Sequence, residues 1–411
     1  MSKTGFPKMF KIAQKFESYA LDQPEQELRD QLISNKVIRR MKRGARVAIA
    51  MGSRGITNIA TLTATVVDEL RRRGADPFIV PAIGSQGGAT PDGQSAILNS
   101  LGITEENVGA PIESCKNVVK VGETEDGLPV YCDELEVRSD LVVAINRIKV
   151  HTAFRADIES GLMKMMAVGL GKRESARTAH GSSKGLAETI PQLARVLMQN
   201  APVGLGIAIV EDSLDKTSRI AVLEPAEIEE TEKRLLRVSK RMMPRIPFDE
   251  LNVLVVEEMG KNISGAGMDP NIIGMGRRLP GEWKPEIDRV VVLDLTEESR
   301  GNAEGLGLAD VTTRRLVDKI DLRATYINCI TSNFFEGGKV PVTKETDREA
   351  IEVALTGYTA ERVRLVRIKN TLKLCEMDVS ESLLGEIQGR DDISILGEQD
   401  RLRFDAEGNL V

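Results

Sequence analysis

The 411-residue sequence has few aromatic side chains, which make up 3% of it and include a single Trp. Proteins that hold single-stranded nucleic acid usually stack its bases on exposed aromatic rings. The net charge is −6 and the pI is about 5.4, whereas nucleic-acid-binding domains are usually basic. The composition therefore argues against a nucleic-acid partner, and the core must be built mainly from aliphatic side chains and Met.

Cysteines and long apolar segments are scarce as well. The four cysteines form no CxxC pair and lie far apart in the chain, at Cys115, Cys132, Cys329 and Cys375. This spacing favours free thiols in a reducing compartment over a disulfide framework or a zinc or iron–sulfur site. No run of about 18 apolar residues is present, and the N-terminus lacks the apolar stretch of a signal peptide. We expect a cytoplasmic protein that has no membrane partner.

Short Val- and Ile-rich runs alternate with helical stretches, a pattern typical of α/β proteins with mostly parallel sheets. Helices are predicted over 58–73, where Gly74 ends the helix, and over 224–245. The predicted strands are 46–51, 77–82, 141–145, 204–210, 251–256, 289–293 and 325–328.

The length suggests two domains. Pro244 and Pro247 close the charged helix, and a new strand begins shortly after them. We therefore expect an N-terminal α/β domain over 1–248, which binds the cofactor and catalyses, and a C-terminal α/β domain over 249–411. The polar tail from about Asp391 is a candidate to pack back on the first domain.

Glycine-rich segments follow several of the predicted strands. In open α/β sheets, ligands bind beyond the carboxyl ends of the strands, and glycine lets backbone N–H groups approach an anion closely. None of these segments is a GxGxxG or Walker sequence, which argues against a standard dinucleotide site or an NTPase. Glycines at strand ends are also often simple turns.

The chain contains only two histidines, His151 and His180, and both lie in one window rich in Gly, Met and Lys. Histidine is suited to proton transfer near neutral pH and is a common metal ligand. A buried structural role is the alternative for each. The nearby methionines at 163, 165 and 166 are better explained as core-filling residues than as metal ligands.

The ordered set of these segments resembles the nickel-dependent lactate racemase family, whose members carry a nickel-pincer nucleotide. The resemblance spans roughly residues 10–340. It rests on GSRG at 52–55, GSQGGAT at 84–90, NRIKVH at 146–151, SGLMK at 160–164, His180 and EEMGK at 257–261.

The resemblance implies a role for each matching position. Lys164 would carry the cofactor through a thioamide, and His180 would bind nickel, for which a neutral imidazole is a suitable ligand. His151 would act as a catalytic acid or base. Arg54 and Lys261 would orient and polarise the substrate, with Glu258 beside it. The remaining cofactor-binding positions would be Gly52, Ser53, Ser160 and Gly161.

The implied activity is racemisation or epimerisation at C2 of a 2-hydroxy acid, by hydride transfer to and from the nickel-pincer nucleotide. The implied partners are a small 2-hydroxy acid and the enzymes that make the cofactor, which would bind transiently. The sequence leaves open whether the chain forms a homo-oligomer. The active site would lie in the cleft between the two domains. The alternatives are a non-catalytic protein that binds or delivers the nucleotide, and an unrelated α/β enzyme that acts on phosphorylated metabolites.

One position departs from the family pattern. The family places a second catalytic histidine in the loop after the second strand, where this chain has Gln86. A carboxamide donates and accepts hydrogen bonds but does not take a proton near pH 7. Another group could serve that face, the substrate could be longer than lactate, or the activity could be altered. A longer polyhydroxy acid fits Gln86 best.

Overall fold

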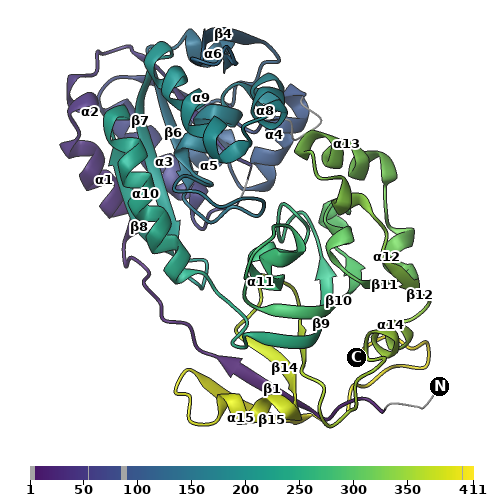
Figure 1. The fold of residues 1–411 in the computed structure, drawn as a ribbon. Coiled ribbons are helices and arrows are strands. Elements are labelled where there is room, and N and C mark those ends of the chain that lie inside the picture. The colour runs from purple at the N-terminus through teal and green to yellow at the C-terminus, as the bar shows by residue number, and fades with distance from the viewer. Residues whose placement is uncertain (1–4, 54, 85–89, 400) are drawn as a thin grey trace. The chain divides into compact units, whose positions relative to one another are not determined.

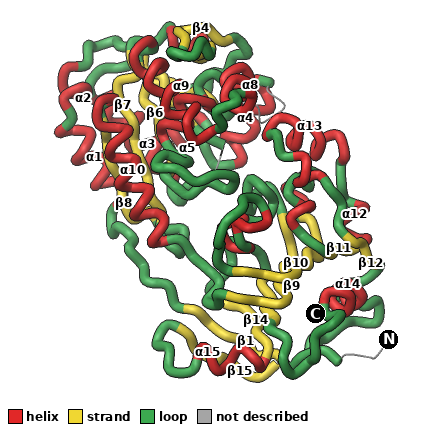
Figure 2. The backbone as a smooth tube through the Cα atoms, in the orientation of Figure 1, coloured by secondary structure: helices red, strands yellow, loops and turns green. Residues whose placement is uncertain are grey.

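The computed structural model describes residues 5–53, 55–84, 90–399 and 401–411. It divides into two compact units (Figure 1). One unit is Ser18–Met243, and the other joins Pro244–Val411 to the N-terminal segment up to Glu17. Each unit contains one large sheet, and Figure 2 shows helices packed beside the strands of each. None of the helices in the described part of the chain has the length and apolar character that a transmembrane segment needs.

The unit Ser18–Met243 is built on a five-stranded sheet whose first four strands are parallel, with the last antiparallel to its neighbour. From β2 the chain first adds β3 on one side and later adds β6 on the other, so the strand order reverses beside β2. The carboxyl edge of a parallel sheet at such a reversal is the usual place for a ligand. In spatial order the strands are β3 (Asp76–Pro81), β2 (Arg46–Met51), β6 (Leu141–Arg147), β7 (Val203–Glu211) and β8 (Thr217–Leu223).

Both faces of this sheet are buried under helices. Successive side chains of β2 point to opposite faces of the sheet. Val47 and Ile49 pack in the core on one face, and Ala48 and Ala50 pack in the core on the other. The Val47 core includes residues of α1 (Pro24–Ser34), α3 (Ile59–Arg72) and α4 (Pro91–Ser100). The Ala48 core includes residues of α7 (Leu162–Lys164), the π-helix η2 (Met165–Gly169), α9 (Leu186–Asn200) and α10 (Pro225–Met242). The remaining elements are α2 (Lys36–Arg40), α5 (Glu105–Val108), the antiparallel pair β4 (Val118–Glu123) and β5 (Pro129–Asp133), α6 (Glu134–Val137) and α8 (Lys172–Gly181).

The second unit contains an eight-stranded mixed sheet. Its first five strands in spatial order are parallel, and the last three run antiparallel to their neighbours. The order is β12 (Val342–Lys344), β11 (Val311–Thr313), β10 (Glu286–Leu295), β9 (Glu250–Met259), β13 (Leu365–Ile368), β14 (Glu376–Ser380), β1 (Met9–Gln14) and β15 (Ile393–Gln399). Its helices are α11 (Pro270–Ile273), α12 (Arg314–Asp318), α13 (Leu322–Ser332), α14 (Asp347–Ala354) and α15 (Leu384–Ile387).

The fold class expected from the sequence, α/β with mostly parallel sheets, is confirmed. The predicted strand over 325–328 is wrong, because these residues lie in α13. The Asp321 side chain accepts a hydrogen bond from the Ala324 amide at 3.0 Å and thereby caps the start of a helix. Three β-branched or aromatic residues followed by Asn328 are too few to distinguish a strand from a helix by pattern alone.

The chain termini also differ from expectation. β1 lies between β14 and β15, so the N-terminal segment belongs to the sheet of the C-terminal half. The tail pairs with β1 in that same sheet. Both segments supply antiparallel strands that cover an edge which would otherwise expose unpaired backbone groups.

Candidate active site

The site begins at the carboxyl ends of β2 and β6, where the strand order reverses. Gly52 and Ser53 follow β2, and a Cβ atom on Gly52 would lie 3.3 Å from Met165 Cε and 3.5 Å from Asn146 Oδ1. The loop after β2 therefore lies closely against the end of β6 and against η2. Arg54 and Gln86, which belong to the predicted site, lie outside the described residues.

The turn that carries Lys164 is anchored to the end of β6. Ser160 and Lys149 exchange backbone hydrogen bonds of 2.8 and 3.2 Å, and Asn146 Nδ2 donates to Gly161 O at 2.8 Å. Lys164 ends α7, which continues directly into η2. π-Helical turns are rare and are often found at functional sites. The predicted cofactor-binding residues Ser160, Gly161 and Lys164 thus form one continuous corner.

His151 lies in contact with Lys164. The distance between Lys164 Nζ and His151 Nε2 is 2.6 Å, and the other ring nitrogen, Nδ1, accepts the Ala153 N–H at 3.0 Å. The imidazole packs on the Phe154 ring with a centroid separation of 4.4 Å. The structure therefore brings together His151 and Lys164, two of the residues that the sequence indicated. Both nitrogens of the histidine ring and one of its faces are in contact with neighbouring groups.

A buried carboxylate fixes the His151 loop. Glu159 is fully buried and accepts the His151 amide hydrogen at 2.7 Å. It also forms ion pairs with Lys240 at 2.7 Å and with Arg155 at 3.5 Å. Burying a carboxylate costs free energy unless the group is paired and hydrogen-bonded. These partners therefore hold Glu159 in one position. Glu159 was not identified from the sequence, although it directly precedes Ser160, a predicted cofactor-binding residue.

A second buried carboxylate supports the Lys164 turn. Glu232 of α10 is fully buried, and its Oε2 accepts the Met163 N–H at 2.9 Å. Burial raises the pKa of Glu232 to about 7, while the nearby Met163 and Leu162 amides oppose the shift by favouring the ionised form. Its sequence signal is the spacing, because Ile228, Glu232 and Leu236 lie four residues apart on the buried face of α10.

His180 lies in the last turn of α8 and is half-buried. The start of that helix is fixed by a buried ion pair of 2.6 Å between Lys172 and Asp133, and Lys172 Nζ also donates to Cys115 O at 2.6 Å. Gly171 allows close packing, since a Cβ there would lie 2.4 Å from Tyr131 O. The element that presents His180 is therefore held firmly at its opposite end.

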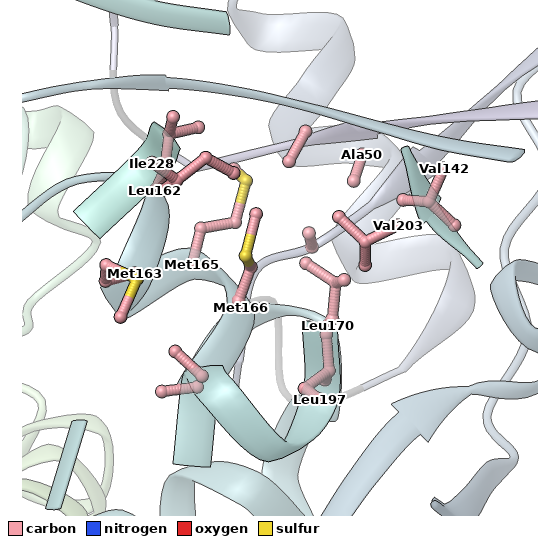
Figure 3. Close-up of a cluster of buried hydrophobic side chains, with 14 of the residues drawn as sticks. Ala50, Val142, Leu162, Met163, Met165, Met166, Leu170, Leu197, Val203 and Ile228 are labelled. Atoms are coloured by element: carbon pink, nitrogen blue, oxygen red, sulfur yellow. The ribbon is translucent and has the colours of Figure 1, made fainter. Parts of the chain in front are cut away.

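Around this corner, the described residues contain no group of three or more His, Cys, Asp or Glu side chains that could hold a metal ion. The methionines of the region are core residues, as the sequence indicated. Figure 3 shows Met163, Met165 and Met166 packed among aliphatic side chains, and none of the three is more than 4% exposed.

Glu258 and Lys261 belong to the other unit, at the carboxyl edge of β9. Asn370 Nδ2 donates to Glu258 Oε1 at 2.8 Å, and Lys369 lies 3.4 Å from the same carboxylate. Lys261 Nζ forms an ion pair with Glu304 at 2.5 Å and donates to Gly265 O at 2.6 Å. The side chains of this pair are 17% and 4% exposed, so the ammonium of Lys261 is held in place mainly by a buried carboxylate.

The comparisons with known proteins bear on the same part of the chain. Residues 15–189 match the family described as the lactate racemase N-terminal domain, a range that includes His151, Lys164 and His180. The structure of the lactate racemase apoprotein from Thermoanaerobacterium thermosaccharolyticum matches with 14% identity and a TM-score of 0.47, over 81% of this chain and 94% of that one. A crystal structure of a protein from Thermotoga maritima matches with 12% identity and a TM-score of 0.54, over 85% of this chain and 97% of that one. Among curated proteins, none is significantly similar in sequence.

Proposed function

Because this chain belongs to the lactate racemase family, we propose that it is an isomerase that inverts C2 of a 2-hydroxy acid. The observation that carries the proposal is the contact of 2.6 Å between Lys164 Nζ and His151 Nε2. It places a group suited to covalent cofactor attachment beside a group suited to proton transfer. Both lie in the domain that matches the family.

The residues present fit a nickel-pincer nucleotide. Lys164 would hold it covalently and His180 would bind its nickel, while Gly52, Ser53, Ser160 and Gly161 would line its binding corner. His180 suits this role because a neutral imidazole is a suitable nickel ligand. When bound, the cofactor supplies a reversible acceptor for the hydride of C2.

His151 would hold and return the proton of the substrate hydroxyl. The Ala153 amide and the Phe154 ring fix the orientation of the imidazole, and Nε2 is the ring nitrogen that faces Lys164. Once the Lys164 nitrogen is acylated it can no longer carry a positive charge. Nε2 would then face the substrate without a competing ammonium beside it. Fixing the ring before substrate binds lowers the entropic cost of the reaction.

The remaining assignments concern the substrate. Arg54 would grip its carboxylate, since guanidinium binds carboxylate with two parallel hydrogen bonds. Lys261 would polarise its hydroxyl, with Glu258 close by. Gln86 in place of a histidine favours a longer polyhydroxy acid, such as an aldonate, because a carboxamide can bind a hydroxyl as donor and acceptor.

The test uses protein loaded by co-expression with the cofactor-making enzymes. It is incubated with a panel of 2-hydroxy acids and aldonates deuterated at C2, and the products are separated by configuration. We expect inverted product that retains its deuterium, because hydride transfer does not exchange with solvent. Inversion with loss of deuterium would contradict hydride transfer. A loaded protein that inverts none of the panel, and that is unchanged by His151→Ala, would favour the nucleotide-binding or delivery role.

A further inference from the structure

The turn that carries Lys164 starts without a cap of its own. Gly161 precedes α7 and has no side chain to accept the first amide hydrogens of the turn. Helix starts leave these N–H groups without partners inside the helix, and a carboxylate or hydroxyl usually accepts from them. Here the acceptor comes from a distant part of the chain, because Glu232 Oε2 accepts the Met163 N–H.

Gly161 and Glu232 are fitted closely to one another. A Cβ atom on Gly161 would lie 2.4 Å from Glu232 Oε1 and 2.6 Å from its Cδ. Any side chain at position 161 would therefore displace the carboxyl group. The absence of a side chain at Gly161 creates the space that Glu232 fills, and the amide that Glu232 binds is that of the residue immediately before Lys164.

Placing a carboxyl group here has a cost that packing alone does not explain. Glu232 Oε1 is buried and has no hydrogen-bond partner among the described residues, and an unpaired buried acceptor is destabilising. An apolar side chain at 232 would match Ile228 and Leu236 on the same buried face of α10 without that cost. A carboxyl group at this position is therefore best explained by its hydrogen bond to the Lys164 turn.

We propose that Glu232 is a positioning residue for Lys164. Its carboxyl group caps the turn from the side of α10 and so holds the Lys164 amine against His151. The assignment rests on the proposed function insofar as Lys164 is the attachment point of the cofactor. The geometric part concerns the protein before any cofactor is bound.

The experiment is carried out on the apoprotein and uses its two histidines. With histidine labelled by 15N, the two imidazoles are observed separately by NMR, and His180→Ala assigns them. Lys164→Met is expected to shift the ring nitrogen signals of His151, because its partner at Nε2 is lost. Glu232→Ala is expected to produce a shift in the same direction. Glu232→Gln, which keeps an acceptor for the Met163 amide, is expected to restore the original signals.

A matched control comes from the same helix. Glu229 lies three residues before Glu232 and pairs at the surface with Arg195 at 2.6 Å, so Glu229→Gln is expected to leave the His151 signals unchanged. A folded Glu232→Ala protein with unchanged His151 signals would overturn the proposal.

If Glu232→Ala does not fold, Gly161→Ala is the variant that tests the proposal, because its methyl group displaces the Glu232 carboxyl group. A His151 shift then supports the proposal, and its absence overturns it. Because no cofactor is present, the outcome is independent of whether the protein can be loaded.

Discussion

Lys164 Nζ lies 2.6 Å from His151 Nε2, while Nδ1 of the same ring accepts a hydrogen bond from the Ala153 amide. The contact places an imidazole where it can take up the proton of the lysine ammonium. The free amine is the nucleophilic form of lysine, so the contact favours acylation of Lys164.

The first prediction concerns this reactivity. In the apoprotein, His151→Ala should lower the rate of Lys164 acetylation by an N-hydroxysuccinimide ester about tenfold, equivalent to about 1.4 kcal/mol, because the imidazole that can take up the proton of the lysine ammonium is removed. The rate is measured by peptide mass spectrometry relative to exposed Lys373. An unchanged ratio of Lys164 to Lys373 labelling would show that His151 does not influence the amine.

A second prediction separates attachment from metal binding. In protein co-expressed with the cofactor-making enzymes, His180→Ala should retain the adduct on Lys164 but lose most of its nickel, because the side chain that binds the metal is gone. Lys164→Ala should lose both. Intact mass and elemental analysis of the same samples measure the two quantities. Full nickel content in His180→Ala would remove His180 from the metal site.

The third prediction follows from the raised pKa of Glu232, about 7 in the folded protein against an ordinary value of 4.5. Folding favours the protonated form, so its contribution to stability is complete below pH 4.5 and is lost as the pH rises through 7. Between pH 5 and 8 the free energy of unfolding should fall by about 2–3 kcal/mol more in the wild type than in Glu232→Gln. Urea unfolding at several pH values measures this. Parallel pH profiles for the two proteins would contradict it.

The fourth prediction concerns the pair formed by Lys261 and Glu304. Lys261→Ala leaves a buried carboxylate without its partner and should destabilise the protein by roughly 3–5 kcal/mol. Adding Glu304→Gln should recover most of that loss, as measured by urea unfolding. If Lys261 also polarises the substrate, the double variant stays inactive in spite of its recovered stability. Recovery of both stability and activity would assign Lys261 a structural role alone.

Much of the fold was predictable because strands buried on both faces read as aliphatic runs. β2, β6 and β9 were identified in this way. β1 and β15 were not, because their contacts join the two ends of the chain and leave no local pattern. α13 was mistaken for a strand because its capping residue, Asp321, was not weighed against a short β-branched run.

The residues of the candidate site also divide into those that the local sequence predicts and those that it does not. His151 and Lys164 were identified because rare or reactive residues cluster in a glycine-rich window. Glu159 and Glu232 were missed because their importance depends on burial, which a single sequence does not reveal. Glu232 could have been noticed as a charge on the apolar face of a helix, between Ile228 and Leu236. The ion pair of Lys261 with Glu304 joins residues 43 positions apart, and no sequence spacing predicts it.

The measurement that tests the central claim most directly is the intact mass and nickel content of the protein after co-expression with the cofactor-making enzymes. We expect an adduct of nucleotide size that maps to Lys164, together with nickel close to one atom per chain. An unmodified mass without nickel, under conditions that load a known lactate racemase, would contradict the account and leave the family relationship without its cofactor chemistry.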